Sequence, residues 1–317
     1  MIKIDGARSE TEQVSLNGEC LWARQLWLQA RSKKWDSSLF SLSADRESWA
    51  ADQLSERERQ LMIDSLAVLH AVAPCIERSS IALYRALTDR SCQCFLLQQA
   101  CQAANHVDMV MYCCDELGIE QQAVGVIPRD IAAILTPLMH DRELTSVDEL
   151  VRSLAEQHLL AGVMVCSTML LLCYEQGLMP RFNGVASLFN HVLHDLVQQH
   201  EFCCDLINAL KANAPNVWNT TQEAELVDVG KECVAVLRGY LHQVCCPGSF
   251  DRACQQLYCL ADYTCERVDL VRLYGSQGYP SWMESTGFVG PQADIACDEV
   301  KAASRLSSVK VQQQEQQ

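Results

Sequence analysis

Basic residues are scarce in this sequence. Its 317 residues include 25 Lys and Arg against 40 Asp and Glu, which gives a formal net charge of -15. A protein that binds nucleic acid without sequence preference needs a basic surface, because it must displace counterions from phosphates. Docking on an anionic membrane surface also depends on clustered basic residues. We therefore expect neither nucleic acid nor a membrane as the partner.

Two further absences concern the N-terminus and the cysteines. The first residues, MIKIDGARSETEQ, contain no apolar leader segment, so we expect a cytoplasmic protein with reduced thiols. The 18 cysteines include no Cys-x-x-Cys pair, the usual spacing of a zinc site. The nearest patterns are Cys92-Gln93-Cys94 and three adjacent pairs, whose side chains point about 100° apart on a helix. We interpret the cysteines as small buried hydrophobic residues.

The alternating pattern of a β-strand is missing too, and residues 50–275 have the patterns of long helices. Ser55 and Glu58 form a capping box before a helix that Pro74 is expected to kink or interrupt. Further helices are predicted over 95–117 up to Gly118, over 129–141 after Pro128, from a capping box at Ser146 to Gly177, over 185–212, from a capping box at Thr220 to Cys245, and from about Phe250 to Tyr274. Long helices with short loops predict an all-α helical bundle.

One segment, Leu159 to Tyr174, carries no charge over 16 residues. It is shorter than the roughly 20 residues that span a bilayer. A helix that is apolar on every face can instead lie at the centre of a large bundle. We interpret it as the central helix.

Several short segments follow one another in a characteristic order. They are KKWDSSLFSLSADRESW with LSERERQLMIDSLAVLHA, then GLMP at 177–180, Asn190 with His200-Glu201-Phe202, LADYTCERVDLVRLYG, and YPSWMESTGF. In this order they resemble the small subunit of class I ribonucleotide reductase, a ferritin-like helical protein, over roughly residues 20–300. The resemblance implies a polar arm at 1–19, a ferritin-like domain at 20–290 and a polar tail at 291–317.

The family resemblance implies a dinuclear iron or manganese centre in the bundle core. Such a centre uses an acid from each of two helices and a Glu-x-x-His pair from each of two others. Here the two histidines remain as His106 and His200. The four acid positions hold Ala73, Ala103, Leu159 and Val197. We therefore expect no cofactor in this protein.

The radical machinery of the family is also altered. The position of the radical tyrosine holds Val110, and Tyr112 lies on another face of the helix. Trp35 matches the tryptophan of the electron path, but the position of its acid partner is assigned to Leu196. The tail SSVKVQQQEQQ lacks the aromatic residue that docks on the large subunit, and residues 293–298 depart from the family pattern.

A different metal site remains an alternative. Glu156 and Glu77 lie one turn from lost acid positions, and zinc or copper could bind with nearby residues such as His70, Cys113, Cys166 and Cys203. The simpler interpretation is that His106 and His200 are hydrogen-bonded core histidines and that apolar residues fill the former metal cavity.

Three hypotheses follow. The first is a pseudoenzyme: a small-subunit homologue without radical-generating activity of its own, acting in deoxyribonucleotide synthesis as a structural or regulatory partner. It would form a homodimer or a heterodimer with a small-subunit paralogue, with the large subunit as a further partner. The second is a ferritin-like scaffold that binds an unrelated protein, and the third is an enzyme with a novel His/Cys metal centre.

Overall fold

The computed structural model describes residues 16, 20–51, 54–139, 146–175, 177–213, 218–245 and 247–276. The expected arm at 1–19 lies outside the described residues, except for Leu16. The expected tail at 291–317 and the segment YPSWMESTGF lie outside them as well.

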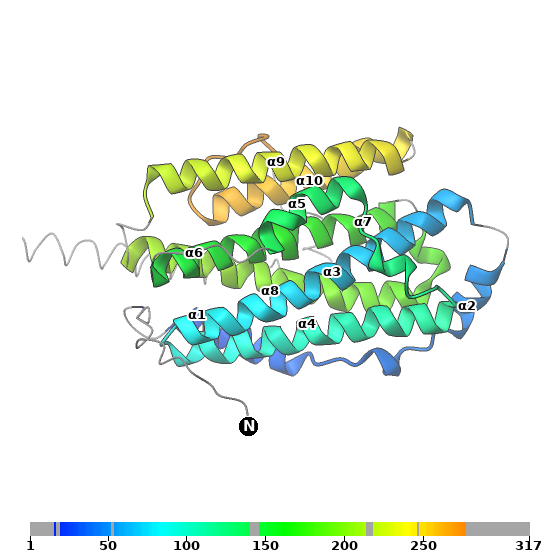
Figure 1. Cartoon of the computed structure of the whole chain (residues 1–317), viewed down its shortest axis with the longest axis horizontal. Coiled ribbons are helices and arrows are strands. Elements are labelled where there is room, and N and C mark those ends of the chain that lie inside the picture. The colour runs from blue at the N-terminus through cyan, green and yellow to red at the C-terminus, as the bar shows by residue number, and fades with distance from the viewer. Residues whose placement is uncertain are drawn as a thin grey trace, which may run out of the picture.

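Regular structure in the described residues is entirely helical, which confirms the all-α prediction (Figure 1). The α-helices are α1 (Leu21–Ser32), α2 (Ser43–Ala50), α3 (Glu56–Ala86), α4 (Arg90–Leu117), α5 (Arg129–Met139), α6 (Val147–Gln157), α7 (Ser167–Glu175), α8 (Asn183–Asn213), α9 (Thr220–Val244) and α10 (Pro247–Arg267). A π-helical segment, His158–Cys166, joins α6 to α7. The long helices α3, α4 and α8 lie side by side, with α9 and α10 along one edge of the bundle (Figure 1).

Local signals placed most helix ends correctly. Ser55 and Glu58 form the reciprocal capping box that opens α3. Gly118 follows α4 with a φ of 72°, the left-handed conformation that glycine adopts without a steric penalty. Of the two outcomes expected at Pro74, a kink or an interruption, the interruption is wrong, because α3 continues from Glu56 to Ala86. Packing along both neighbouring helices outweighs the local loss of one backbone donor.

Two predicted ends need correction, and one helix was missed. The cap of α9 is Asn219 rather than Thr220, since the Asn219 side chain accepts from the backbone N–H of Gln222. The last helix ends at Arg267 instead of Tyr274, because the chain turns back over α10. There the Asp262 carboxylate accepts backbone N–H groups at 2.6 to 2.8 Å, those of Leu273, Tyr274 and Ser276. The helix α1 was not predicted at all.

Two clusters of buried apolar side chains form the core. One lies between α3, the second half of α4, α7, the first half of α8, α9 and α10. The other lies between α1, the start of α4, α6 and the second half of α8. Thirteen of the sixteen described cysteines are buried, which confirms their interpretation as core residues.

Two helical stretches, Glu56–Ala86 and Val147–Cys173, are long and apolar enough to cross a membrane by length and composition alone. Inside the protein, 80% of the most apolar window of Val147–Cys173 is buried. Core helices of a bundle pass the same test, so the burial favours the central-helix interpretation.

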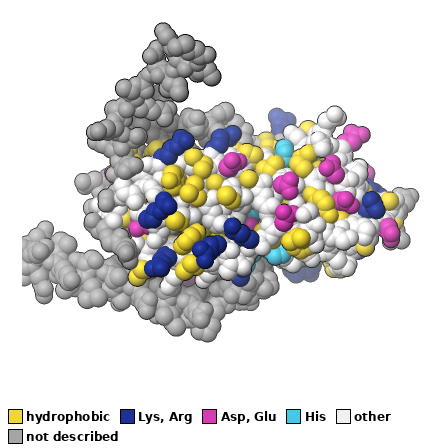
Figure 2. All heavy atoms as spheres, turned by 90° about the horizontal axis from the view of Figure 1, so that it is seen from below, with side chains coloured by type: hydrophobic (Ala, Val, Ile, Leu, Met, Phe, Trp, Pro, Cys, Tyr) yellow, Lys and Arg dark blue, Asp and Glu magenta, His cyan; other side chains and the backbone are white. Residues whose placement is uncertain are grey.

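Charge is unevenly distributed on the surface. Figure 2 shows one face on which acidic side chains gather toward one end and basic side chains toward the other, with apolar side chains among the basic ones. The acidic excess of the chain is therefore not spread evenly over this face.

Candidate functional site

Three residues from distant parts of the sequence meet in the bundle. Asp195 on α8 accepts the indole N–H of Trp35 at 3.1 Å, on its Oδ2 atom. The same oxygen lies 3.0 Å from Nε2 of His106 on α4. The Trp35 and His106 rings are stacked, with centroids 6.0 Å apart. Tryptophan, carboxylate and imidazole thus form one continuous hydrogen-bonded row, which we call the Trp35–Asp195–His106 row.

The row is buried and held from several sides. The side chains of His106 and Asp195 are 4% and 5% exposed. Gln102, one turn before His106, donates its amide N–H to Oδ1 of Asp195 at 2.7 Å. Asn105 donates to the backbone carbonyl of Trp35 at 3.2 Å. Trp35, Gln102 and His106 therefore surround the Asp195 carboxylate inside the bundle.

The row corrects one sequence assignment. Leu196 was placed opposite Trp35, but the acid that binds Trp35 is Asp195, one residue earlier. In the sequence assignment, the second Glu-x-x-His pattern begins at the residue after the acid that binds Trp35. Counted from Asp195, its acid and imidazole positions fall on Leu196 and Gln199, in place of Val197 and His200.

His200 points away from the row. It follows Asp195 by five residues, about 140° around a helix. Its Nε2 atom lies 2.9 Å from Oγ1 of Thr264 on α10, and its ring stacks on Tyr263 at 5.2 Å between centroids. His106 and His200 therefore bind different neighbours, and their contacts do not join them in one site.

Gln199 lies closer to Asp195 around α8 than His200 does. It follows Asp195 by four residues and so lies about 40° from it around α8. Its amide N–H donates to the backbone carbonyl of His158, where the π-helical segment begins, at 3.1 Å. The imidazole of His158 lies 2.6 Å from Oγ of Ser79 on α3. Burial lowers the pKa of His158 to about 3, so this imidazole is neutral.

Apolar side chains occupy the remaining predicted positions. All five are buried, with at most 2% of the residue exposed: Ala73, Ala103, Val110, Leu159 and Val197. Tyr112 donates its hydroxyl to the backbone carbonyl of Phe40, at 2.6 Å, and is thus engaged near α2.

The suggested substitute ligands lie elsewhere. Glu77 is exposed on α3, and Glu156 pairs with Arg152 at 2.9 Å within α6. Among the described residues, the only group of three or more His, Cys, Asp or Glu side chains close enough to share a metal is Cys20, Asp89 and Cys92. Cys92 precedes His106 by fourteen residues on α4, about 21 Å along the helix.

Several buried polar atoms near the row have no hydrogen-bond partner among the described residues. They include Nδ1 of His106 and both amide atoms of Gln99 and Gln198. Helices α4 and α8 run antiparallel, because Phe95 stacks on Phe202 and His106 meets Asp195. Gln99 and Gln198 lie between these two contacts along their helices. The face of α4 and α8 that carries the row is therefore polar, although the predicted acid positions on these helices, Ala103 and Val197, are apolar.

A second buried polar group lies between α8 and α10. Arg267 donates to Glu201 at 2.5 Å and to Asp205 at 3.1 Å, and Tyr263 donates its hydroxyl to Glu201 at 2.8 Å. Burial alone would raise the pKa of Glu201, but the contact with His200 and the charge of Arg267 lower it to about 2. Burial raises the pKa of Asp205 to about 7 despite Arg267.

Comparison with known proteins decides the family. The sequence model of the protein family described as ribonucleotide reductase, small chain, matches residues 14–280 of this chain. The chain belongs to this family. Ribonucleoside-diphosphate reductase subunit beta of Chlamydia pneumoniae is 23% identical over an alignment of 288 residues, and the match covers 84% of this chain and 82% of that protein.

Solved structures of small chains share the fold. A putative class I ribonucleotide reductase from Bacillus halodurans has a TM-score of 0.76 at 11% identity, and the match covers 84% of this chain and 99% of that one. The dimanganese(II)-NrdF of Streptococcus sanguinis has a TM-score of 0.67 at 11% identity, covering 88% and 99%. The predicted ferritin-like bundle of the ribonucleotide reductase small chain is confirmed.

Proposed function

We propose that this small-chain homologue is catalytically degenerate and assists or regulates ribonucleotide reduction as the structural partner of an active small subunit. The observation that carries the proposal is the contrast around His106. The Trp35–Asp195–His106 row is intact, while the side chains at the assigned acid positions are buried and apolar. Such a protein keeps the architecture of the family without its radical chemistry.

The donor set supports the loss of the metal centre. Two hard, oxygen-activating metal ions need several carboxylates, since neutral apolar side chains offer no ligand atom. With the one-residue shift on α8, the acid positions hold Ala73, Ala103, Leu159 and Leu196, and one imidazole position holds Gln199. His106 is then the single matching ligand. These residues do not fit a dinuclear iron or manganese centre.

The retained row has a structural role in this proposal. Asp195 connects α8 to α4 through His106 and to the segment before α2 through Trp35. When one partner of a buried, hydrogen-bonded charged group is removed, the remaining groups are left without hydrogen bonds. This loss is strongly destabilising. The row is therefore kept because the bundle depends on it, even without electron transfer.

A mixed apolar and basic face offers a docking surface for the active subunit. Leu21 and Leu28 on α1 are 57% and 43% exposed, and Leu97 on α4 is 38% exposed. Arg24 and Arg31 share the exposed side of α1 with the leucines, at helical spacing. α1 and α4 start together and pack along each other. Figure 2 shows apolar and basic side chains intermingled in this way.

Co-expression tests the proposed partnership. The full chain is expressed with the metal-binding small subunit and the large subunit of the same cell, and complexes are separated by size with mass detection. We expect a one-to-one heterodimer with the active small subunit. A chain that stays monomeric and binds neither reductase subunit contradicts the proposal. Binding of an unrelated protein instead favours a scaffold function.

Matched surface variants locate the interface. Leu28→Glu places a charge among the exposed leucines of α1 and is expected to weaken the heterodimer at least about 10-fold. Val271→Glu, at a residue that is 85% exposed beyond α10, is the control and should leave the heterodimer unchanged. Equal effects of both variants contradict the docking of α1.

Metal content tests the degeneracy directly. The chain is produced alone in iron- and manganese-supplemented medium and analysed for both elements, with the active small subunit prepared in parallel. We expect less than about 0.1 iron or manganese per chain here. Near-stoichiometric iron or manganese, lost in a His106→Ala variant, contradicts a degenerate centre.

A further inference from the structure

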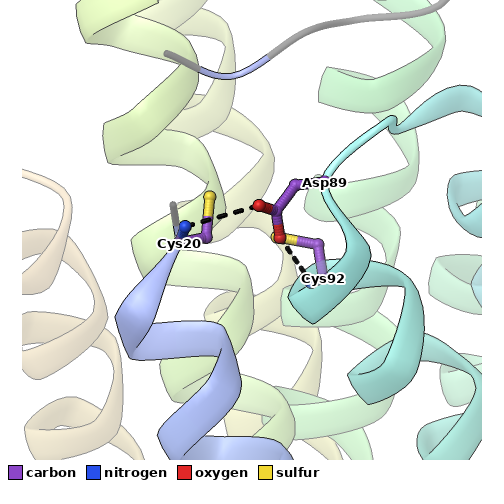
Figure 3. A group of neighbouring side chains, drawn as sticks. All are labelled: Cys20, Asp89 and Cys92. Atoms are coloured by element: carbon purple, nitrogen blue, oxygen red, sulfur yellow. Dashed lines mark hydrogen bonds between the residues drawn. The ribbon is translucent and has the colours of Figure 1, made fainter. Parts of the chain in front are cut away.

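The starts of α1 and α4 bring two thiols and a carboxylate together. Cys20 immediately precedes α1, Asp89 is the N-cap of α4, and Cys92 lies in the first turn of α4. Their ligand atoms all lie within 4.8 Å of one another. Figure 3 shows the three side chains converging in the space between the two helix starts.

Backbone hydrogen bonds hold the carboxylate in place. Oδ1 of Asp89 accepts the backbone N–H of Cys92 at 2.8 Å, and Oδ2 accepts the backbone N–H of Cys20 at 3.4 Å (Figure 3). A carboxylate oxygen has two lone pairs, so each oxygen keeps one for a further ligand. The carboxylate is thus oriented before any cation arrives, which is the preorganisation that a metal site needs.

The thiols lie in an apolar setting. Cys20 is 5% exposed and Cys92 is fully buried, and both belong to the hydrophobic cluster that includes Leu16, Leu87 and Phe95. The hydrogen bond with Cys20, burial and the nearby Asp89 raise the pKa of Cys92. A divalent cation reverses these effects, because it neutralises the mutual repulsion of two thiolates and a carboxylate.

We propose that Cys20, Cys92 and Asp89 form a zinc-type site that clips the start of α1 to the start of α4. Two thiolates and one carboxylate suit Zn²⁺, and an exchangeable water completes a tetrahedral shell. Binding of Zn²⁺ displaces the two thiol protons to solvent and changes no oxidation state. The site is separate from the family's metal position, since Cys92 lies about 21 Å along α4 from His106.

A disulfide between Cys20 and Cys92 accounts for less of the geometry. It would use two of the three converging side chains and leave the Asp89 side chain without a role. Its formation also requires an external oxidant to take up two electrons. The third donor, oriented by two backbone N–H groups, is the feature that favours a cation over a redox pair.

Cobalt binding is the direct test. The full chain is reduced, freed of metal and titrated with Co²⁺ under anaerobic conditions. We expect thiolate-to-cobalt charge-transfer absorption that saturates at one ion per chain and disappears when Zn²⁺ is added. Added Zn²⁺ should also raise the melting temperature, because an ion that binds only the folded state stabilises it by mass action.

Matched variants assign the ligands. Cys92→Ala should abolish the charge-transfer band, whereas Cys203→Ala, another fully buried cysteine on α8, should keep it. Asp89→Asn retains helix capping, since Asn is as good a cap as Asp, and should lower cobalt affinity at least about 10-fold. If Cys92→Ala does not fold, Cys20→Ala takes its place, because Cys20 makes no side-chain cap.

Three results would overturn the site: no charge-transfer band in the wild-type chain, an unchanged band in the Cys92→Ala or Cys20→Ala variant, or a Cys20–Cys92 disulfide in freshly isolated protein that binds no cobalt after reduction. The test does not depend on the reductase partnership, because it reads a sulfur-bound ion in the isolated chain. Iron or manganese bound at His106 would contradict the proposed function and leave the cobalt result intact.

Discussion

The carboxylate of Asp195 lies 3.0 Å from Nε2 of His106 and joins α8 to α4 in the buried centre of the bundle. Trp35 donates to the same oxygen atom, so a single acid satisfies groups that lie far apart in the sequence. The side chains at the four assigned acid positions, Ala73, Ala103, Leu159 and Val197, are apolar and buried.

Asp195→Asn tests the stabilising role of the row. The amide removes the charge and turns one acceptor into a donor that faces Trp35 or Gln102. We expect the free energy of unfolding to fall by about 1.5–3 kcal/mol, the range for a hydrogen bond to a charged group. Urea unfolding measures this free energy. The control is Asp115→Asn on the exposed side of α4, which should change the free energy of unfolding by less than about 0.5 kcal/mol. Equal losses in both variants would contradict a special role for Asp195.

Restoring one acid tests whether the core still accepts a metal. Ala103→Glu places a carboxylate at a position that is 2% exposed, and Ala104→Glu places one on the exposed side of the same helix. Without a cation, we expect Ala103→Glu to lose about 3–5 kcal/mol of stability at neutral pH. The raised pKa of the new acid should make this loss vanish below about pH 4.3, where the carboxyl is protonated in both states.

Ala104→Glu should stay within about 0.5 kcal/mol of the wild type over the same pH range. An Ala103→Glu protein that is as stable as the wild type and retains iron or manganese would show that a metal pocket persists in the bundle. Chemical unfolding at several pH values, combined with elemental analysis, distinguishes the two results.

Arg267→Gln tests the buried charges between α8 and α10. It removes the cation that faces Glu201 and Asp205, so two buried acids lose their partner. We expect a loss of about 3–5 kcal/mol at neutral pH. The control is Arg272→Gln, whose pair with Glu266 is largely exposed and should contribute less than about 1 kcal/mol. A small loss in Arg267→Gln would show that water replaces the arginine.

His158 should give the protein an acid-sensitive component of stability. Burial lowers its pKa in the folded state to about 3, from the ordinary value of 6.5. The unfolded chain therefore binds the proton more readily between these values, and stability contributed by the neutral imidazole is lost as the pH falls from 6.5 toward 3. His158→Gln should remove this component, so its stability should fall less steeply over that window.

The exposed His242 supplies the comparison. A His242→Gln variant should keep the pH dependence of the wild type, since it leaves the buried imidazole of His158 in place. Unfolding free energies at half-unit steps of pH measure both slopes. A His158→Gln protein with the wild-type slope would mean that other groups dominate the acid response.

Helix positions could be predicted from local chemistry. Ser55 with Glu58, and Gly118 after α4, satisfy the orphan backbone groups of their own helix ends, and this requires only neighbours in the sequence. Pro74 and the end of α10 could not be predicted in this way. The continuity of α3 depends on packing, and the turn after Arg267 depends on Asp262 binding a returning segment.

The sequence alone determined the helical class and the family, because both follow from residue types at known spacing. Tertiary structure alone decided which residue of α8 meets Trp35, because a shift of one residue turns a side chain by about 100° and exchanges Leu196 for Asp195. It also decided which residues share a site: His106 meets Asp195, His200 faces Thr264, and Cys20 meets Cys92. Such contacts between side chains depend on how the helices pack, and the local sequence pattern does not encode that packing.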